Sequence, residues 1–141
     1  SADDEVQVLL SHGQSSQMTR FEALGIEAVV PADRLASLRV ALQLVHIQQD
    51  IAEYVIQVIR ASREDPSLSY GASTRAATAL VQAARVWAAF DGRDFVLPDD
   101  IKHLAVPALR HRVVLSPTAE IEGRTTDDVL DAILAAIPAP R

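Results

Sequence analysis

The sequence of 141 residues predicts an all-α helical bundle, and it leaves room for a small two-stranded accessory sheet. Apolar residues recur three and four positions apart through most of the chain, which is the period of an α-helix with one buried face. Proline, glycine and aspartate separate these periodic segments, as they do at helix ends. With 49% hydrophobic and 23% charged residues, the chain can bury an ordinary core as one domain, or as one domain plus a piece of another.

The N-terminal quarter predicts two helices with a poorly patterned stretch between them. Residues 3–11 form a short helix with an acidic first turn, which suits the positive end of the helix dipole. Residues 14–19 are polar and loop-like, and 21–30 carry only a weak pattern. Pro31 then opens a clear helix. Its apolar positions share one face: Leu35, Leu38, Leu42 and Val45.

The next helix is expected over residues 49–63, after a single extended step at 46–48. The Asp-Pro-Ser sequence at 65–67 ends it, because the residue before a proline disfavours the helical conformation. The expected inward positions are Ile51, Val55, Val58 and Ile59.

A long helix over residues 76–90 follows a break at Gly71, with Ser73 as its N-cap. The helix is apolar nearly all round and rich in alanine, so it is expected at the centre of the bundle. We expect Trp87 and Phe90 to fill the core in preference to binding a ring-shaped ligand. Gly92 ends the helix in the left-handed cap conformation.

Two short extended pieces are predicted around the following helix, which starts at Pro98. We expect residues 95–97 to pair with a small strand at 113–115, forming a two-stranded accessory. Pro107 kinks or restarts the helix, so that 107–112 is a separate turn.

The last helix is capped by Thr125 or Thr126. Its inward face consists of Val129, Leu130, Ile133 and Leu134. Pairs of acids stand at the starts of three predicted helices, where helix electrostatics explains them without catalysis. These pairs are Asp3-Asp4, Asp99-Asp100 and Asp127-Asp128.

Arg75 is the most unusual residue of the chain, because it falls in the first turn of the long helix. A cation there opposes the helix dipole at a cost of about 0.3–1 kcal/mol unless an anion lies nearby. Free backbone N–H groups and a guanidinium group together suit a phosphate. The alternative is a surface arginine that extends into solvent.

Complete catalytic machinery is absent from the sequence. A phosphate-binding loop needs Gly-Lys-Ser/Thr, whereas the single lysine is Lys102. The four histidines (12, 46, 103 and 111) lack metal-ligand spacing, and there is no cysteine. The Ser15-Ser16 pair and Ser73 have no base within sequence reach. The net charge of −6 argues against a nucleic-acid partner, and no apolar run is long enough to span a membrane.

His111 and Arg112 form a cationic pair at a predicted helix end. There they suit the negative end of the helix dipole, and a ligand-binding role is the alternative. The acidic start of the chain differs from a signal peptide, and together with the lack of cysteine it fits a cytoplasmic protein.

Several motifs together resemble the C-terminal part of a MoxR-type AAA+ ATPase. The main ones are Gly-Ala-Ser-Thr-Arg-Ala at 71–76, Gly-Arg-Asp-Phe-Val-Leu-Pro-Asp-Asp-Ile-Lys at 92–102 and Leu-Arg-His-Arg-Val-Val-Leu-Ser-Pro at 109–117. Shorter matches lie at 45–47, 60–64, 122–125 and 138–141. The family usually has proline where this chain has Thr74, and threonine can also occupy a first helical position.

This resemblance implies that residues 31–141 form the helical lid of the ATPase, and that 1–30 are the end of the nucleotide-binding core plus a linker. It implies that Arg75 is the sensor 2 arginine that reaches the nucleotide phosphates, with Ser73 and Thr74 as further candidates. ATP and Mg²⁺ would be bound by the whole protein, with no nucleotide tightly bound to this part alone. The resemblance also implies three partners: the missing core, the neighbouring subunits of a ring, and a von Willebrand factor A-domain protein. The ring is expected to be a hexamer.

Two further interpretations remain open from the residues alone. The first is a stand-alone helical module that binds a protein partner and never binds nucleotide. The second is a helical sensor with a small-molecule pocket between its helices. In the ATPase interpretation the whole protein performs chaperone-like remodelling or assembly of protein clients.

Overall fold

The structure is a computed structural model that describes residues 1–13, 25–26 and 29–140. The chain divides into two units, Ser1–Ala36 and Ser37–Arg141. The first contains helix α1 (Ala2–Gly13), which has the predicted acidic first turn. The predicted loop at 14–19, with Ser15 and Ser16, and most of the weakly patterned segment lie outside the described residues.

Helix α2 (Ala32–Leu42) begins directly after Pro31, as predicted. Its apolar stripe is not buried, since Leu35 and Leu38 are 45% and 46% exposed. Val45, which follows the helix, is buried. An apolar stripe at helical spacing shows which face can be buried, but it does not supply a surface to cover that face.

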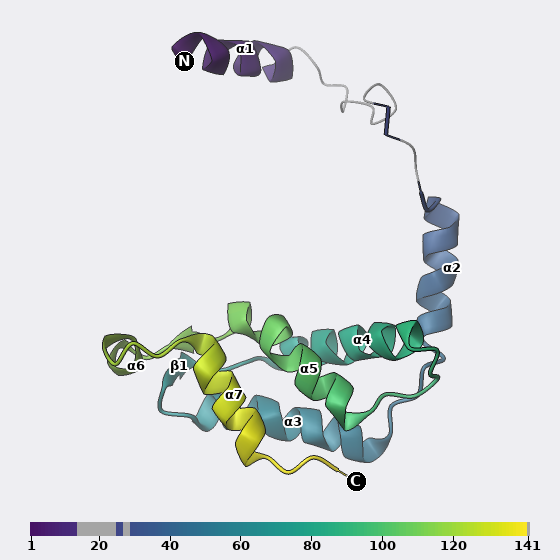
Figure 1. Cartoon of the computed structure of the whole chain (residues 1–141), viewed down its shortest axis with the longest axis vertical. Helices are drawn as coiled ribbons and strands as arrows, with labels where there is room; N and C mark the ends of the chain where they lie inside the picture. Colours follow the sequence, from purple (N-terminus) through teal and green to yellow (C-terminus); the bar gives the residue numbers. More distant parts are fainter. Residues whose placement is uncertain (14–24, 27–28, 141) are drawn as a thin grey trace. The chain divides into compact units, whose positions relative to one another are not determined.

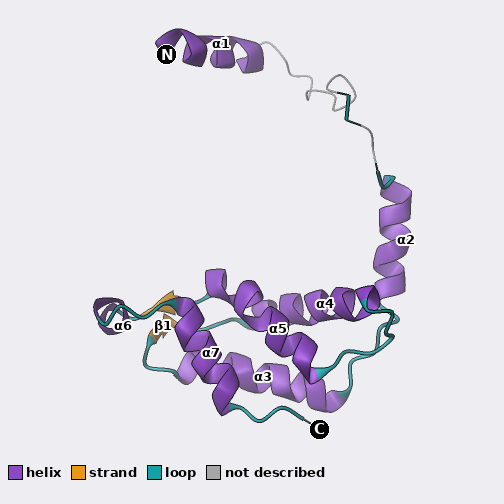
Figure 2. Ribbon diagram, in the orientation of Figure 1, coloured by secondary structure: helices purple, strands orange, loops and turns teal. Residues whose placement is uncertain are grey.

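The core of the second unit lies between α3 (Gln49–Glu64), α4 (Thr74–Phe90), α5 (Pro98–Leu109) and α7 (Thr126–Ala136), which Figures 1 and 2 show side by side. All four predicted inward residues of α3 are buried, together with Tyr54 and Ser62. Helix α7 is capped by Thr125, whose side chain accepts a hydrogen bond from the Asp128 N–H. The large buried side chains include Ile59, Leu80, Ile101, Leu109 and Leu130.

Helix α4 buries a face made mainly of alanine. Its buried residues are Ala76, Ala77, Leu80, Ala84 and Ala88. Small side chains allow the axes of packed helices to approach closely. The prediction that Trp87 and Phe90 fill the core is wrong, because their exposed fractions are 40% and 83%. In a helix that is apolar all round, the periodicity cannot indicate which face is buried.

The two-stranded accessory exists, but its pairing was predicted incorrectly. Strand β2 (Val114–Leu115) pairs antiparallel with β1 (Leu68–Tyr70), not with residues 95–97. Phe95 instead forms a single parallel bridge with His46, in the extended step before α3. Because β1 has three residues, it is too short to show an alternating pattern in the sequence.

Helix α5 continues through Pro107 and ends at Leu109, so the predicted restart at Pro107 is wrong. A proline in the last turn removes one backbone hydrogen bond, and the remaining packing retains the helix. A 3₁₀ turn, η2 (Arg110–Arg112), follows it. The short helix α6 (Pro117–Ile121), which Ser116 caps at the N-terminus, was not predicted from the sequence.

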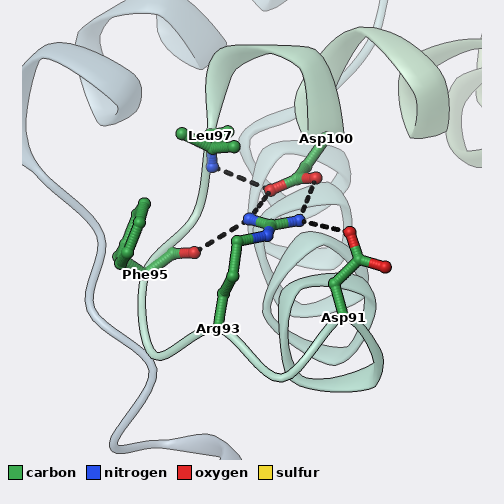
Figure 3. Close-up of polar contacts among 5 residues, drawn as sticks. All are labelled: Asp91, Arg93, Phe95, Leu97 and Asp100. Carbon is green, nitrogen blue, oxygen red and sulfur yellow. Dashed lines mark hydrogen bonds and ion pairs between the residues drawn. The ribbon is translucent and has the colours of Figure 1, made fainter.

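An ion pair between the buried Asp100 and the partly buried Arg93 fixes the connection between α4 and α5 (Figure 3). The Arg93 guanidinium donates to both carboxylate oxygens of Asp100, each at 2.8 Å. The same carboxylate accepts from the Leu97 N–H at 2.8 Å, which caps α5. Arg93 also donates to the Phe95 carbonyl and to Asp91, both at 3.1 Å. Asp100 therefore caps the start of α5, and Asp99 lies in the same acidic first turn, where the sequence placed both acids.

Candidate functional site

Helix α4 begins directly after Ser73, the N-cap that the sequence predicted. Ser73 is the N-cap, and its side-chain oxygen accepts a hydrogen bond from the Ala76 N–H at 3.3 Å. Thr74 and Arg75 occupy the first two helical positions. Their N–H groups donate to no partner within the described part of the chain, as is usual for a first turn. The arrangement leaves two backbone donors available to an external acceptor.

The electrostatics of this first turn differ from those of the other α-helices that the structure describes. Each of the others carries an acidic residue in its first turn. Helix α4 has none and carries Arg75 instead. The Arg75 side chain is exposed and forms no hydrogen bond or ion pair with any described residue. The positive end of the helix and the guanidinium group therefore lack a negative partner within the described residues.

The end of α3 holds the loop that leads into α4, a feature that the sequence analysis missed. The buried hydroxyl of Ser62 accepts from the Ala72 N–H at 2.9 Å and donates to the Ile59 carbonyl at 2.7 Å. Arg63 donates from Nε to the Ala72 carbonyl at 2.7 Å, and its Nη2 lies 3.5 Å from the Thr74 hydroxyl. The position of Ser62, four residues after Val58 on the buried stripe of α3, was the available signal.

Gly71 allows the loop and α3 to touch. A Cβ atom at this position would lie 2.5 Å from the Cα of Arg63 and closer still to the Ser62 carbonyl oxygen. The glycine is required here for space and not for an unusual backbone angle. Residues 71–73 therefore lie directly against the last turn of α3.

His111 and Arg112 lie near the same end of the two-stranded sheet as this loop. Tyr70, the last residue of β1, pairs with Val114, the first residue of β2, so the loop after β1 and the η2 turn before β2 leave the sheet at one end. Arg112 donates from Nε to His111 Nε2 at 3.0 Å. Arg110 forms an exposed ion pair with Asp127 at 3.0 Å.

The chemical capacity of the site is anion binding. The N-terminus of α4 offers free N–H groups, a positive dipole end and a fork of guanidinium donors, all of which suit phosphate oxygens. The described residues contain no group of three or more metal-ligating side chains, and no described helix is long and apolar enough to cross a membrane.

The sequence matches the AAA lid domain family over residues 60–133, which is more than half of the chain. The chain belongs to this family. The matched range of the AAA lid contains the end of α3, Arg75 and the Arg93–Asp100 pair.

Named relatives place this AAA lid in a MoxR-type ATPase. The chain is 34% identical over 115 residues to the uncharacterized protein YeaC of Bacillus subtilis, covering 82% of this chain and 36% of that protein. It is 30% identical over 104 residues to the chaperone MoxR1 of Mycobacterium tuberculosis, covering 67% and 28%. It is 39% identical over 71 residues to the MoxR protein of Methylorubrum extorquens, covering 50% and 21%.

A solved structure supports the same assignment. A crystal structure of a candidate ATPase from Cytophaga hutchinsonii superimposes with a TM-score of 0.75 and 28% sequence identity, covering all of this chain and 44% of that one. The chain spans about a third or less of the length of the curated relatives described above. The resemblance to the C-terminal lid region of a MoxR-type AAA+ ATPase is thereby confirmed.

Proposed function

We propose that Arg75 is the sensor 2 arginine of this lid, and that it binds the γ-phosphate of ATP held by the core of the whole protein. The observation that carries the proposal is the first turn of α4. It has an exposed guanidinium, free N–H groups and no acid, and Arg75 has no partner among the described residues. A phosphate would supply the missing negative charge.

The residues present fit such a group chemically. Arg75 can donate two parallel hydrogen bonds to phosphate oxygens, which a lysine cannot do. The Thr74 and Arg75 N–H groups add donors in the same turn, while Ser73 uses its oxygen to cap the helix and keeps its O–H proton as a donor. Mg·ATP supplies the phosphoanhydride bond that is hydrolysed, and Arg75 neutralises charge on the transferring group. Its contact ties the position of the lid to the state of the nucleotide.

The test is ATP turnover by the full-length protein with Arg75→Ala and with Arg75→Lys. We expect Arg75→Ala to lower turnover about 10²-fold or more, because a charge-assisted contact in the transition state is lost. Arg75→Lys should restore only part of this activity, because an ammonium group lacks the bidentate fork. The melting temperature should not fall, since the exposed side chain packs against little and alanine is the better helix former.

Arg60 supplies the matched control. It is an exposed arginine on α3 without a hydrogen bond or ion pair to any residue that the structure describes. Arg60→Ala should leave turnover and melting temperature close to those of the unmodified protein. If Arg75→Ala lowers stability while turnover per folded molecule stays unchanged, Arg75 has a structural role and the sensor 2 assignment is wrong.

We also propose that the whole protein is a ring-forming ATPase, expected to be a hexamer, that works in the cytoplasm on protein clients in a chaperone-like manner. The relative from Mycobacterium tuberculosis is named a chaperone, which supports this proposal. A von Willebrand factor A-domain protein remains the proposed accessory partner. The exposed aromatic side chains of Trp87 and Phe90 on α4 support a contact with the core or with a neighbouring subunit, because large apolar groups are commonly buried at interfaces.

A further inference from the structure

We propose that Arg63, at the end of α3, is a positioning residue that sets where Arg75 lies. The proposal rests on the sensor 2 function of Arg75 proposed above. Arg63 belongs to a different helix and contacts the main chain immediately before the N-cap of α4. It acts on Arg75 through this loop, with no direct contact between the two side chains.

Arg63 contacts the start of α4 on both sides of its N-cap, with a short hydrogen bond before it and a longer one after it. Its Nε donates to the Ala72 carbonyl, one residue before Ser73, and its Nη2 lies beside the Thr74 hydroxyl, one residue after it. A single planar guanidinium thus spans the N-cap. Because its donors have a fixed geometry, the group restrains both residues relative to each other.

The same loop has little freedom to move in other ways. Ser62 binds the Ala72 N–H, so both backbone groups of Ala72 are held by adjacent residues of α3. Gly71 touches the Arg63 backbone with no room for a side chain. Arg75 lies three residues after Ala72, in a helix that starts from this fixed point. A shift of about 1 Å in a group that binds a transition state can cost about a hundredfold in rate, so the position of this start is relevant to catalysis.

Charge gives a second reason to connect Arg63 with the phosphate site. Arg63 brings another cation to the positive end of α4, where no acid of the first turn balances it. The Arg63 charge is favourable at the end of α3, and it also lies beside the start of α4. An anion bound at the start of α4 would therefore be attracted by Arg63 as well as by Arg75.

The experiment is a double-mutant cycle for ATP turnover in the full-length protein, using Arg63→Met and Arg75→Ala alone and together. Methionine keeps the length of the side chain and removes its donors and charge. We expect Arg63→Met to lower kcat about fivefold to tenfold, the loss typical for one hydrogen bond of ordinary net strength, and to change KM for ATP less. In the Arg75→Ala background, Arg63→Met should have almost no further effect, because the residue that it positions is absent.

Two further variants separate positioning from general structural support. Arg63→Lys, which keeps the charge and one set of donors, should restore part of the lost kcat. Arg60→Met, three residues earlier on the same helix, should leave kcat unchanged. Melting temperatures of all variants confirm that the compared proteins are folded.

The outcomes distinguish this inference from the function on which it rests. If Arg75→Ala lowers turnover but Arg63→Met has no effect, or has the same effect in both backgrounds, Arg63 does not position Arg75 and the inference is wrong. If Arg75→Ala itself leaves turnover unchanged, the sensor 2 proposal fails and this inference fails with it. A loss that disappears in the Arg75→Ala background supports both.

Discussion

Asp100→Asn is expected to destabilise the lid more than Asp99→Asn, which changes the neighbouring acid in the same turn of α5. Asp100 is 4% exposed, and its carboxylate accepts three hydrogen bonds, two from Arg93 and one from the Leu97 N–H. Asparagine has nearly the same shape but no charge and one acceptor oxygen. An oxygen in the place of Oδ2 can still accept from the Leu97 N–H and from Arg93 Nη1, but the second bond of the bidentate pair, from Arg93 Nη2, is lost.

The expected loss of stability depends on which contacts Arg93 keeps after the substitution. Loss of one partner from a fully buried ion pair costs about 3–5 kcal/mol. Arg93 keeps its contacts with the Phe95 carbonyl and with Asp91, and its side chain is 19% exposed, so water screens part of the remaining charge. We therefore expect a loss of about 2–3 kcal/mol in the free energy of unfolding, which is less than the loss for a fully buried pair. For a domain of about 100 residues this corresponds to a fall of roughly 10 °C or more in melting temperature.

The assay is urea unfolding of the chain at pH 7, followed by circular dichroism, with Asp99→Asn as the matched control. Asp99 stands in the same first turn but is exposed and accepts no hydrogen bond from any described residue. Its replacement removes only an interaction with the helix dipole, worth about 0.3–1 kcal/mol. Equal losses for the two variants would refute the reasoning, because the ion pair with Arg93 would then contribute nothing.

The pH dependence gives an independent check. Burial by itself would raise the pKa of Asp100, but the hydrogen bonds from Arg93 and from the Leu97 N–H outweigh it and lower the pKa below 3.8. A lowered pKa in the folded state means that the stabilisation is present above the unfolded-state pKa and is lost as pH falls through the folded-state pKa. The difference in stability between the unmodified chain and Asp100→Asn should therefore be constant near neutral pH and should narrow below about pH 4.

Two further outcomes are expected. Gly71→Ala should lower the free energy of unfolding by about 2–3 kcal/mol, because its Cβ would clash with α3. Gly92→Ala should lower it by only about 1–2 kcal/mol, because its φ of +71° is unfavourable for alanine. If urea unfolding ranks the two variants in the opposite order, the close approach at Gly71 is contradicted. The chain of 141 residues on its own should release no phosphate from ATP, because its sequence has no Gly-Lys-Ser/Thr loop, and steady release that survives removal of contaminating ATPases would disprove this.

Local features of the fold were predictable from the sequence. The N-cap at Ser73, the positive φ of Gly92 and the acidic start of α5 each depend on a few adjacent residues, and each is confirmed. The choice of strand partner was not predictable, because β1 and β2 are separated by α4 and α5 and are too short to carry a pattern. The exposure of Phe90 was missed for a related reason, since a helix that is apolar on every side does not reveal which side its neighbours cover.

The candidate site was predictable in part. Arg75 could be found because its charge contradicts its place in a helix, which is a local conflict visible in the sequence. Arg63 could not be found in this way, because an arginine in the last turn of a helix is favourable and attracts no notice. The role that we propose for Arg63 depends on its hydrogen bond to Ala72, nine residues later, and only the fold brings these two residues together.

The alanines on the buried face of α4 determine how the lid can respond to a force. An alanine side chain has no rotamers, so the four buried alanines of α4 offer no side-chain torsions through which to absorb a displacement. Ala105 on α5 is equally inflexible. A displacement of Arg75 would therefore move α4 and the helices packed against it, with little of the displacement absorbed by side-chain rotation. The first turn of α4, which we propose to contact a phosphate, would then move together with the helices packed against α4.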